Sequence, residues 1–291
     1  METGFDWIRY RKSRKIWYNK LMKAIDGKGI AREIIERLKG EPAPQKIFAA
    51  ILVGDNAASE SFVKQKEKVA KELGIDFRIY RFPETSTNDS LRREVGKIAN
   101  LSRVGAMIVQ LPLPAHINAQ YVLNAIPPEK DVDVLGERAL GSFYANRNAI
   151  VAPSVAVCEE LFVREGVELQ KRNVAVVGLG VLVGRPIATW LMKKAKEVYA
   201  LDQGSDLEII KNADVVISGV GKAGLIGTEM LKHGAVVIDF GYSFDKEGNI
   251  RGDFDHDELH PEGWYTPTPG GTGPILIAKL MENYYLLNKG E

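Results

Sequence analysis

Short apolar runs alternate with segments of helical periodicity along most of this chain, and this alternation restricts the fold more than any other feature. The runs predict strands and the periodic segments predict helices. In the first half, the predicted helices cover 29–38, 59–73 and 88–98, and the predicted strands cover 46–53, 76–82 and 106–109. Strands and helices in this order form βαβ units, in which helices cover both faces of a parallel sheet.

A second series of the same kind follows Ala149. Its predicted helices cover 154–164, 185–194 and 275–287, and its predicted strands cover 174–177, 197–201, 215–218 and 235–239. Glycines mark the turns between these short strands, as in a doubly wound nucleotide-binding sheet. Residues 136–148 are rich in Gly and Asn and only weakly periodic, so they are the best boundary between the two series.

Length and composition agree with a two-domain protein. A chain of 291 residues is longer than one hydrophobic core usually supports. Its 39 basic and 38 acidic residues nearly cancel, so no global field attracts nucleic acid or a membrane surface. One cysteine, Cys158, excludes a disulfide framework and fits a reducing compartment. No apolar run approaches 18 residues. We therefore expect a cytoplasmic protein with no nucleic-acid or membrane partner.

The N-terminus departs from this balance, with seven cations and no acid between Trp7 and Lys23. No apolar run follows these charges, so the segment is not a secretory signal. The simplest interpretation of residues 1–21 is a solvated, partly helical extension, and organelle targeting and anion binding are the alternatives. Met22 opens the segment Met22-Lys-Ala-Ile-Asp-Gly-Lys28, so a further interpretation of the preceding residues is an appendage to a domain that begins there.

A glycine-rich turn, Gly178-Leu-Gly-Val-Leu-Val-Gly184, follows the predicted strand 174–177 and precedes a predicted helix. Such glycines let the backbone approach a pyrophosphate, and the helix N-terminus supplies N–H donors. The spacing is one residue longer than the standard fingerprint. Asp202 ends the next strand, 24 residues after Gly178, where an acid accepts the ribose hydroxyls of NAD. These features predict a dinucleotide site, with a turn that binds no ligand as the alternative.

The expected dinucleotide contacts lie in this turn and at the ends of the neighbouring strands. They are Gly178, Leu179, Gly180, Val183, Gly184, Arg185, Asp202, Gly219, Val220 and Gly241. No metal site is expected, because the four histidines (His116, His233, His256 and His260) show no HExxH pattern.

Several motifs go beyond what periodicity requires. In chain order they are Val53–Ser59, Phe62–Lys66, Val109–Pro114, Pro128–Asp133, Val183–Pro186, Gly252-Asp253 and Pro267–Pro274. Together they resemble the methylenetetrahydrofolate dehydrogenase/cyclohydrolase family, known as FolD. The resemblance extends from Met22 to about Leu287, which is nearly the whole chain outside the extension.

The resemblance implies a two-domain α/β fold with a cleft between the domains. Residues 22–148, joined by a C-terminal helix over 275–291, would form an α/β folate-binding catalytic domain. Residues 149–274 would form a doubly wound Rossmann-type NAD(P)-binding domain. The implied enzyme is a homodimer that binds a folate in the cleft. It would oxidise 5,10-methylenetetrahydrofolate with NAD or NADP and hydrolyse the methenyl product to 10-formyltetrahydrofolate.

By the same resemblance, Lys66 would be the general acid/base, Gln110 its hydrogen-bond partner and Asp133 the anchor of the pterin. Read alone, Lys66 is a solvated helix charge and Gln110 a polar strand end. Asp131 is the less favoured candidate for the pterin anchor. The alternative role for Asp131 is a cap. The implied substrate contacts are Phe62, Gln110, Leu111, Pro112, Asp133, Pro269, Gly270 and Gly271.

The chain also departs from the family pattern. Phe62 replaces a tyrosine, so a hydroxyl that positions protons is lost. Val134 replaces the glycine after the paired aspartates, Ala152-Pro-Ser-Val155 replaces Pro-Cys-Thr-Pro, and Leu276 replaces a threonine.

The departure in the phosphate turn bears on the cofactor. Gly178-Leu-Gly180 replaces the Gly-Arg-Ser that resembles a clamp for the NADP 2′-phosphate. Together with Asp202 this favours NAD, although the longer turn leaves Gln203 or Ser205 as alternative ribose partners. Two other functions stay open: a relative with only one of the two activities, and a non-catalytic folate- or nucleotide-binding homologue.

Overall fold

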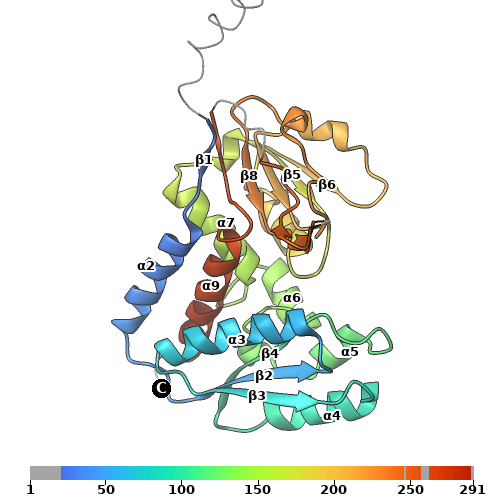
Figure 1. Ribbon diagram of the computed structural model, residues 1–291. Coiled ribbons are helices and arrows are strands. Elements are labelled where there is room, and N and C mark those ends of the chain that lie inside the picture. Colours follow the sequence, from blue (N-terminus) through green and yellow to red (C-terminus); the bar gives the residue numbers. More distant parts are fainter. Residues whose placement is uncertain (1–20, 246, 257–261, 290–291) are drawn as a thin grey trace, which may run out of the picture. The chain divides into compact units, whose positions relative to one another are not determined.

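The computed structural model describes residues 21–245, 247–256 and 262–289 (Figure 1). Residues 1–20 of the predicted extension and His260 lie outside the described residues. The chain divides into two compact units, which we describe separately. The three-stranded unit holds residues 27–168, 180–192 and 272–289, and the six-stranded unit holds 21–26, 169–179 and 193–271. No helix among the described residues is both long and apolar enough to cross a membrane.

The three-stranded unit is built on a parallel sheet with the strand order β3-β2-β4. The strands are β2 (Ile47–Val53), β3 (Phe77–Phe82) and β4 (Val104–Val109). Every residue of β2 and β4 is buried, as expected for parallel strands covered on both faces.

The same unit contains the helices that connect these strands and further helices that pack on one another. They are α2 (Gly27–Lys39), α3 (Ala57–Glu72), α4 (Asn88–Ala99), α5 (Ala119–Leu123), α6 (Glu137–Tyr144), α7 (Pro153–Arg164), α8 (Gly184–Leu191) and α9 (Thr272–Leu287), with a short 3₁₀ turn, η1, at Pro128–Lys130. Local sequence sets several of their starts. The Asn56 side chain accepts a hydrogen bond from the Ser59 amide at 2.9 Å, and Thr87 and Ser90 form a capping box before α4.

The two faces of β2 pack against different helices. Ile47, Ala49, Ile51 and Val53 join the core that contains α4, whereas the ring of Phe48 stacks on Tyr284 of α9 at a centroid distance of 5.3 Å. This division follows from the two-residue repeat of a strand. Figure 1 shows α3 and α4 on opposite sides of this sheet.

Ion pairs connect three helices of the same unit. Lys279 of α9 lies 2.6 Å from Glu160 of α7 and 2.9 Å from Glu282, and its side chain is only 9% exposed. Glu282 also pairs with Arg37 of α2. These contacts place a buried cation between acids from two helices.

The six-stranded unit is built on a sheet with the order β1-β11-β8-β7-β5-β6, in which all registered neighbours are parallel. Its strands are β1 (Lys23–Ala24), β5 (Asn173–Val177), β6 (Glu197–Leu201), β7 (Val215–Ser218), β8 (Val236–Asp239) and β11 (Trp264–Tyr265). A hairpin, β9 (Ser243–Phe244) with β10 (Ile250–Arg251), and three 3₁₀ turns, η2 (Leu169–Lys171), η3 (Leu207–Asn212) and η4 (Thr228–Met230), complete the unit.

The strand order reverses at β5, because β6 lies on one side of it and β7 on the other. Ligands of doubly wound sheets bind outside the carboxyl ends of the strands at such a switch point. The predicted fold class, two α/β units with parallel sheets, is therefore confirmed.

Some element bounds differ from those predicted. The helix predicted over 185–194 ends at Leu191, because Met192 is extended and Lys193 has a φ of 63°. The segment 136–148, treated as a boundary, contains α6. The C-terminal helix begins at Thr272, before the predicted start at Ile275.

Candidate active site

Helix α3 carries Lys66 on the side of the helix that faces the protein. Ser59, Phe62 and Lys66 follow at i, i+3 and i+7 and therefore share one helix face. Burial lowers the pKa of Lys66 below its ordinary value, while the charge of Asp133 opposes this shift. A lysine in this setting is an amine that releases its proton more readily than a solvated one.

Gln110 follows β4 directly and meets Lys66. The Lys66 Nζ donates to the Gln110 Oε1 at 2.8 Å, and the Gln110 Nε2 donates to the Leu111 carbonyl at 2.7 Å. The second bond orients the amide so that its oxygen faces the lysine. The Leu111-Pro112 peptide bond is cis, which shapes the turn directly after Gln110. The structure therefore brings the predicted residues Lys66 and Gln110 into contact.

Asp133 lies close enough to Lys66 for each charge to act on the pKa of the other. Burial raises the pKa of Asp133, and the lysine opposes this rise. Burial thus makes the lysine release its proton more readily and the carboxyl retain one more readily than either group would in water. The carboxylate has two acceptor oxygens for donors of a ligand.

Asp131, the alternative anchor, has a different role. Its Oδ2 accepts hydrogen bonds from the amides of Leu135 at 2.9 Å and Gly136 at 2.7 Å, directly before α6. Burial raises its pKa to about 6. Asp131 therefore caps the turn before α6. Between the two aspartates and this turn, Val134 has a φ of 58°, a conformation that favours glycine and is strained for a β-branched residue.

Ser59 is a candidate that the sequence analysis missed. It is 2% exposed, and its hydroxyl has no hydrogen-bond partner among the residues that the structure describes. A buried hydroxyl without a partner is costly, and this one lies on the helix face that carries Lys66. The helical spacing of Ser59, Phe62 and Lys66 is the signal by which it was detectable in the sequence.

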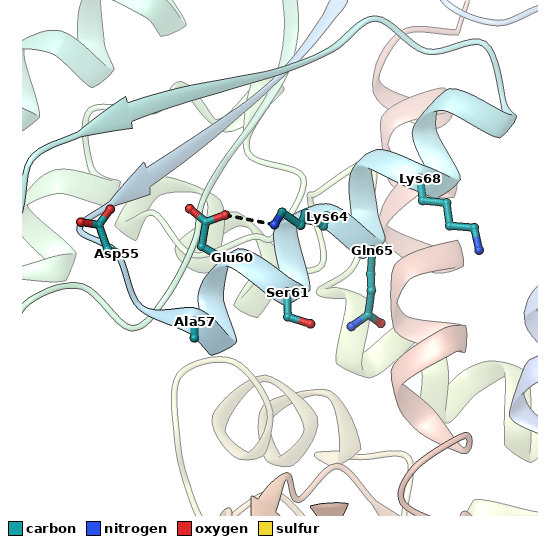
Figure 2. A pocket seen from close by; sticks show the side chains of 7 residues that line it. All are labelled: Asp55, Ala57, Glu60, Ser61, Lys64, Gln65 and Lys68. Atoms are coloured by element: carbon teal, nitrogen blue, oxygen red, sulfur yellow. Dashed lines mark ion pairs between the residues drawn. The ribbon is translucent and has the colours of Figure 1, made fainter.

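A surface hollow of about 700 Å³ lies on the other side of α3 (Figure 2). Its lining residues are Asp55, Ala57, Glu60, Ser61, Lys64, Gln65 and Lys68. Lys64 lies 3.8 Å from Glu60 there and is well exposed. Most of these positions lie on the face of α3 opposite Lys66. The hollow is therefore separate from the contact between Lys66 and Gln110.

In the six-stranded unit, three of the predicted dinucleotide contacts meet at the ends of β5 and β7. Gly178 has a φ of 84°, and a Cβ placed on it would lie 2.8 Å from Val220 Cγ2 and 3.1 Å from the Gly219 carbonyl oxygen. Only glycine fits this close approach. The Gly219 amide in turn donates to the Val177 carbonyl at 3.0 Å.

Asp202 lies at the carboxyl end of β6. The register pairs Val177 with Leu201, and the Gly178 amide donates to the Leu201 carbonyl at 2.8 Å. Asp202 is thus level with Gly178 and exposed. Its backbone amide donates to the Ser205 Oγ at 3.0 Å, which closes the turn that follows.

Gly241, another predicted dinucleotide contact of this unit, lies between two carboxylates that were not predicted as site residues. Asp239 ends β8 and is 1% exposed, and Asp253 is 0% exposed. The Gly241 amide donates to the Asp239 Oδ1 at 2.6 Å, and a Cβ on Gly241 would lie 2.3 Å from the Asp253 carboxyl carbon.

The other predicted residues are divided between the units. Gly180, Val183, Gly184 and Arg185 belong to the three-stranded unit, where Gly184 begins α8 and the Arg185 amide donates to the Gly180 carbonyl at 3.1 Å. Pro269, Gly270 and Gly271 belong to the six-stranded unit. There, Thr268-Pro269 is cis and Gly270 has a φ of 104°. A Cβ on Gly271 would lie 2.5 Å from the Pro267 carbonyl oxygen.

Two family models match this chain. The catalytic domain of tetrahydrofolate dehydrogenase/cyclohydrolase matches residues 25–133, and the NAD(P)-binding domain of the same enzyme matches residues 152–290. The bifunctional protein FolD of Staphylococcus aureus (strain Newman) is 34% identical over 277 residues, which cover 92% of this chain and 96% of that protein.

Solved structures agree with these matches. The bifunctional enzyme FolD of Campylobacter jejuni superimposes with a TM-score of 0.86 at 31% identity, covering 92% of this chain and 99% of that one. The Trypanosoma brucei methylenetetrahydrofolate dehydrogenase-cyclohydrolase, complexed with NADP and an inhibitor, gives a TM-score of 0.85 at 30% identity, with 92% and 98% coverage.

Proposed function

This chain belongs to the tetrahydrofolate dehydrogenase/cyclohydrolase family and is an NAD(P)-dependent methylenetetrahydrofolate dehydrogenase with methenyltetrahydrofolate cyclohydrolase activity, and we propose that Lys66 is the residue on which both reactions depend. The observation that carries this proposal is the contact between the Lys66 Nζ and the Gln110 Oε1 at 2.8 Å, in surroundings that lower the pKa of the lysine.

The two reactions make different demands on Lys66. A bound nicotinamide would supply a hydride acceptor for the methylene carbon of the folate, which would become a methenyl cation. A neutral amine beside that carbon does not repel the developing charge, and burial favours the neutral form. In the hydrolysis, Lys66 takes a proton from the attacking water and returns one to the nitrogen that leaves. A lysine whose pKa is lowered by burial is better suited to both transfers than a solvated one.

Gln110 orients this lysine through a hydrogen bond, and the charge of Asp133 acts on the pKa of the lysine. The amide oxygen of Gln110 fixes the Nζ, because its own nitrogen is bound to the Leu111 carbonyl. Asp133 accepts N–H groups of the pterin in a bidentate bond and so anchors the substrate beside Lys66. The Phe62 ring supplies a stacking surface on the same helix face.

The test is to replace Lys66 and to follow both reactions separately. Lys66→Met keeps the length and apolar stem of the side chain, so we expect folding and folate binding to persist. Methenyltetrahydrofolate hydrolysis should fall by a factor on the order of 10² or more. Lys64→Met, two residues away on the exposed side of α3, is the matched control and should hydrolyse like the wild type. Hydrolysis at the wild-type rate in Lys66→Met contradicts the assignment.

For the cofactor, we propose that NAD is preferred over NADP. Leu179 and Gly180 offer no charge to a 2′-phosphate, whereas Asp202 is exposed at the strand end level with Gly178. An acid at this position accepts the ribose hydroxyls and repels a phosphate. The catalytic efficiency with NAD should exceed that with NADP by about tenfold or more, equivalent to roughly 1.4 kcal/mol.

Steady-state assays with each cofactor measure this preference. The double variant Leu179→Arg with Asp202→Ser should shift it toward NADP. Equal efficiencies in the wild type would contradict the role of Asp202 and direct attention to Gln203 or Ser205. The predicted domain bounds, the homodimer and the cytoplasmic location stay predictions.

A further inference from the structure

Asp253 holds the loop that follows β7. Its Oδ2 accepts the Ser218 hydroxyl at 2.6 Å and the Val220 amide at 2.7 Å, and its Oδ1 accepts the Lys222 amide at 2.7 Å. Three donors converge on one carboxylate that is 0% exposed. Charge-assisted bonds of this length are among the stronger hydrogen bonds in proteins. The backbone from 218 to 222 is therefore fixed from behind by a side chain 31 to 35 residues further along the chain.

A second carboxylate fixes the place of the first. Asp239 accepts the amides of Gly241 at 2.6 Å and Phe254 at 2.9 Å. A Cβ on Gly252 would lie 2.0 Å from the Asp239 Oδ2, and one on Gly241 would lie 2.3 Å from the Asp253 carboxyl. Each acid is thus packed against a glycine beside the other. Burial raises the pKa of Asp239 to about 7, with the neighbouring charge of Asp253 adding to the rise.

We propose that Asp253 is a positioning residue for the dinucleotide, acting through the backbone of Gly219 and Val220. These residues lie at the carboxyl ends of β5 and β7, where the strand order reverses and ligands bind. A loop already held in one conformation loses less entropy when a ligand binds, so Asp253 raises affinity without touching the ligand. This inference rests on the proposed function, because it concerns the same NAD(P) site.

The test compares Asp253→Asn with Asp214→Asn. In Asp253→Asn, one acceptor oxygen becomes an NH₂ group, which then faces either the Lys222 amide or both the Val220 amide and the Ser218 hydroxyl. We expect the KM for the dinucleotide to rise about tenfold or more, while the KM for the folate changes little. Methenyltetrahydrofolate hydrolysis, assayed without dinucleotide, should stay within about twofold of the wild type, since that reaction transfers no hydride.

Asp214 is the matched control, because its carboxylate also accepts a backbone amide, that of Asn173 at 2.9 Å, but at the opposite ends of β5 and β7. Asp214→Asn should leave the KM for the dinucleotide unchanged. Ser218→Ala removes one of the three donors to Asp253 and should raise that KM by a smaller factor, which provides a test even where Asp253→Asn does not fold.

Three results would overturn the positioning role: an unchanged KM in both Asp253→Asn and Ser218→Ala, an equal rise in Asp214→Asn, or a parallel loss of hydrolysis. A wild-type protein that reduces neither NAD nor NADP would instead contradict the proposed function.

Discussion

The buried cation of the three-stranded unit offers a quantitative test of how this fold is held together. Replacing Lys279 by methionine keeps most of the side-chain volume and removes the charge between Glu160 and Glu282. The lysine lies 2.6 Å and 2.9 Å from these acids and is 9% exposed. Both acids would then lose one cation while remaining largely buried.

Two opposing effects set the size of the expected loss in the free energy of unfolding. At an effective dielectric constant of about 20, unit charges at these separations attract by about 6 kcal/mol per pair, and desolvation of the three groups offsets most of this. Removing one partner of a buried pair typically costs about 3–5 kcal/mol. Arg164 stays within 2.6 Å of Glu160, and Arg37 stays paired with Glu282. We therefore expect the lower end, a loss of about 3 kcal/mol in the free energy of unfolding.

Urea unfolding, followed by circular dichroism and by loss of hydrolysis, measures this loss. With a denaturant slope of about 3 kcal/mol/M, the midpoint should fall by about 1 M. The effect should shrink at acidic pH. Burial opposes ionisation of Glu160, but hydrogen bonds from Lys279 and Arg164 hold its pKa below the ordinary value of 4.5. The stabilisation is thus present above pH 4.5 and is lost as the pH falls through the lowered pKa.

Lys39 provides the matched control. Its Nζ also contacts two acids, Glu36 and Glu72, each at 2.7 Å, but its side chain is 35% exposed. Solvent screens such pairs, so Lys39→Met should change the midpoint little. Lys279 does not stabilise the fold through its buried charge if Lys279→Met loses no more stability than Lys39→Met, or if its loss is the same at pH 4 as at pH 7.

Three further results are expected. Asp133→Ala should weaken folate binding by about 2–5 kcal/mol and leave dinucleotide binding nearly unchanged; calorimetric titration with each ligand measures this, and equal losses would indicate a folding role instead. Phe62→Tyr should raise the ratio of hydrolysis to dehydrogenation by about 2- to 10-fold if the missing hydroxyl orients a proton, and an unchanged ratio in paired assays would exclude that role. Burial raises the pKa of Asp239 to about 7, so the folded state binds more protons than the unfolded one between pH 3.8 and 7, and stability falls as the pH rises through this range. Melting temperatures of Asp239→Asn should therefore vary less between pH 5 and 8 than those of the wild type, and parallel curves would contradict the assigned pKa.

The sequence was sufficient for the longer strands of both sheets and for two residues of the candidate site, Lys66 and Gln110; the two-residue strands β1, β9, β10 and β11 were not predicted. Continuous apolar runs such as 47–53 predicted buried parallel strands, because both faces of such strands are covered. Lys66 and Gln110 were predicted from motifs, and the structure joins them at 2.8 Å. Periodicity alone favoured a solvated charge for Lys66, so the motif, rather than the helix pattern, identified it.

Other features depend on contacts between residues far apart in the chain. Asp253 meets Ser218 and Val220 over more than 30 residues, and no local pattern marks its carboxylate as buried. In the sequence, Lys279 is indistinguishable from a solvated helix charge. Its buried ion pair depends on Glu160 of α7, which lies far away in the chain. The short α6 was missed because Gly and Asn at both ends obscured its helical repeat.

The one cysteine of this chain makes the protein convenient for spectroscopic labelling. Cys158 lies in α7 at 0% exposure, and burial raises the pKa of its thiol, so it does not compete for maleimide reagents. New cysteines can be placed at exposed apolar positions, for example Val163 in the three-stranded unit (83% exposed) and Phe244 in the six-stranded unit (57% exposed). Dyes at these two positions would report by energy transfer whether the units move relative to each other when folate or dinucleotide is added, with the native thiol left in place.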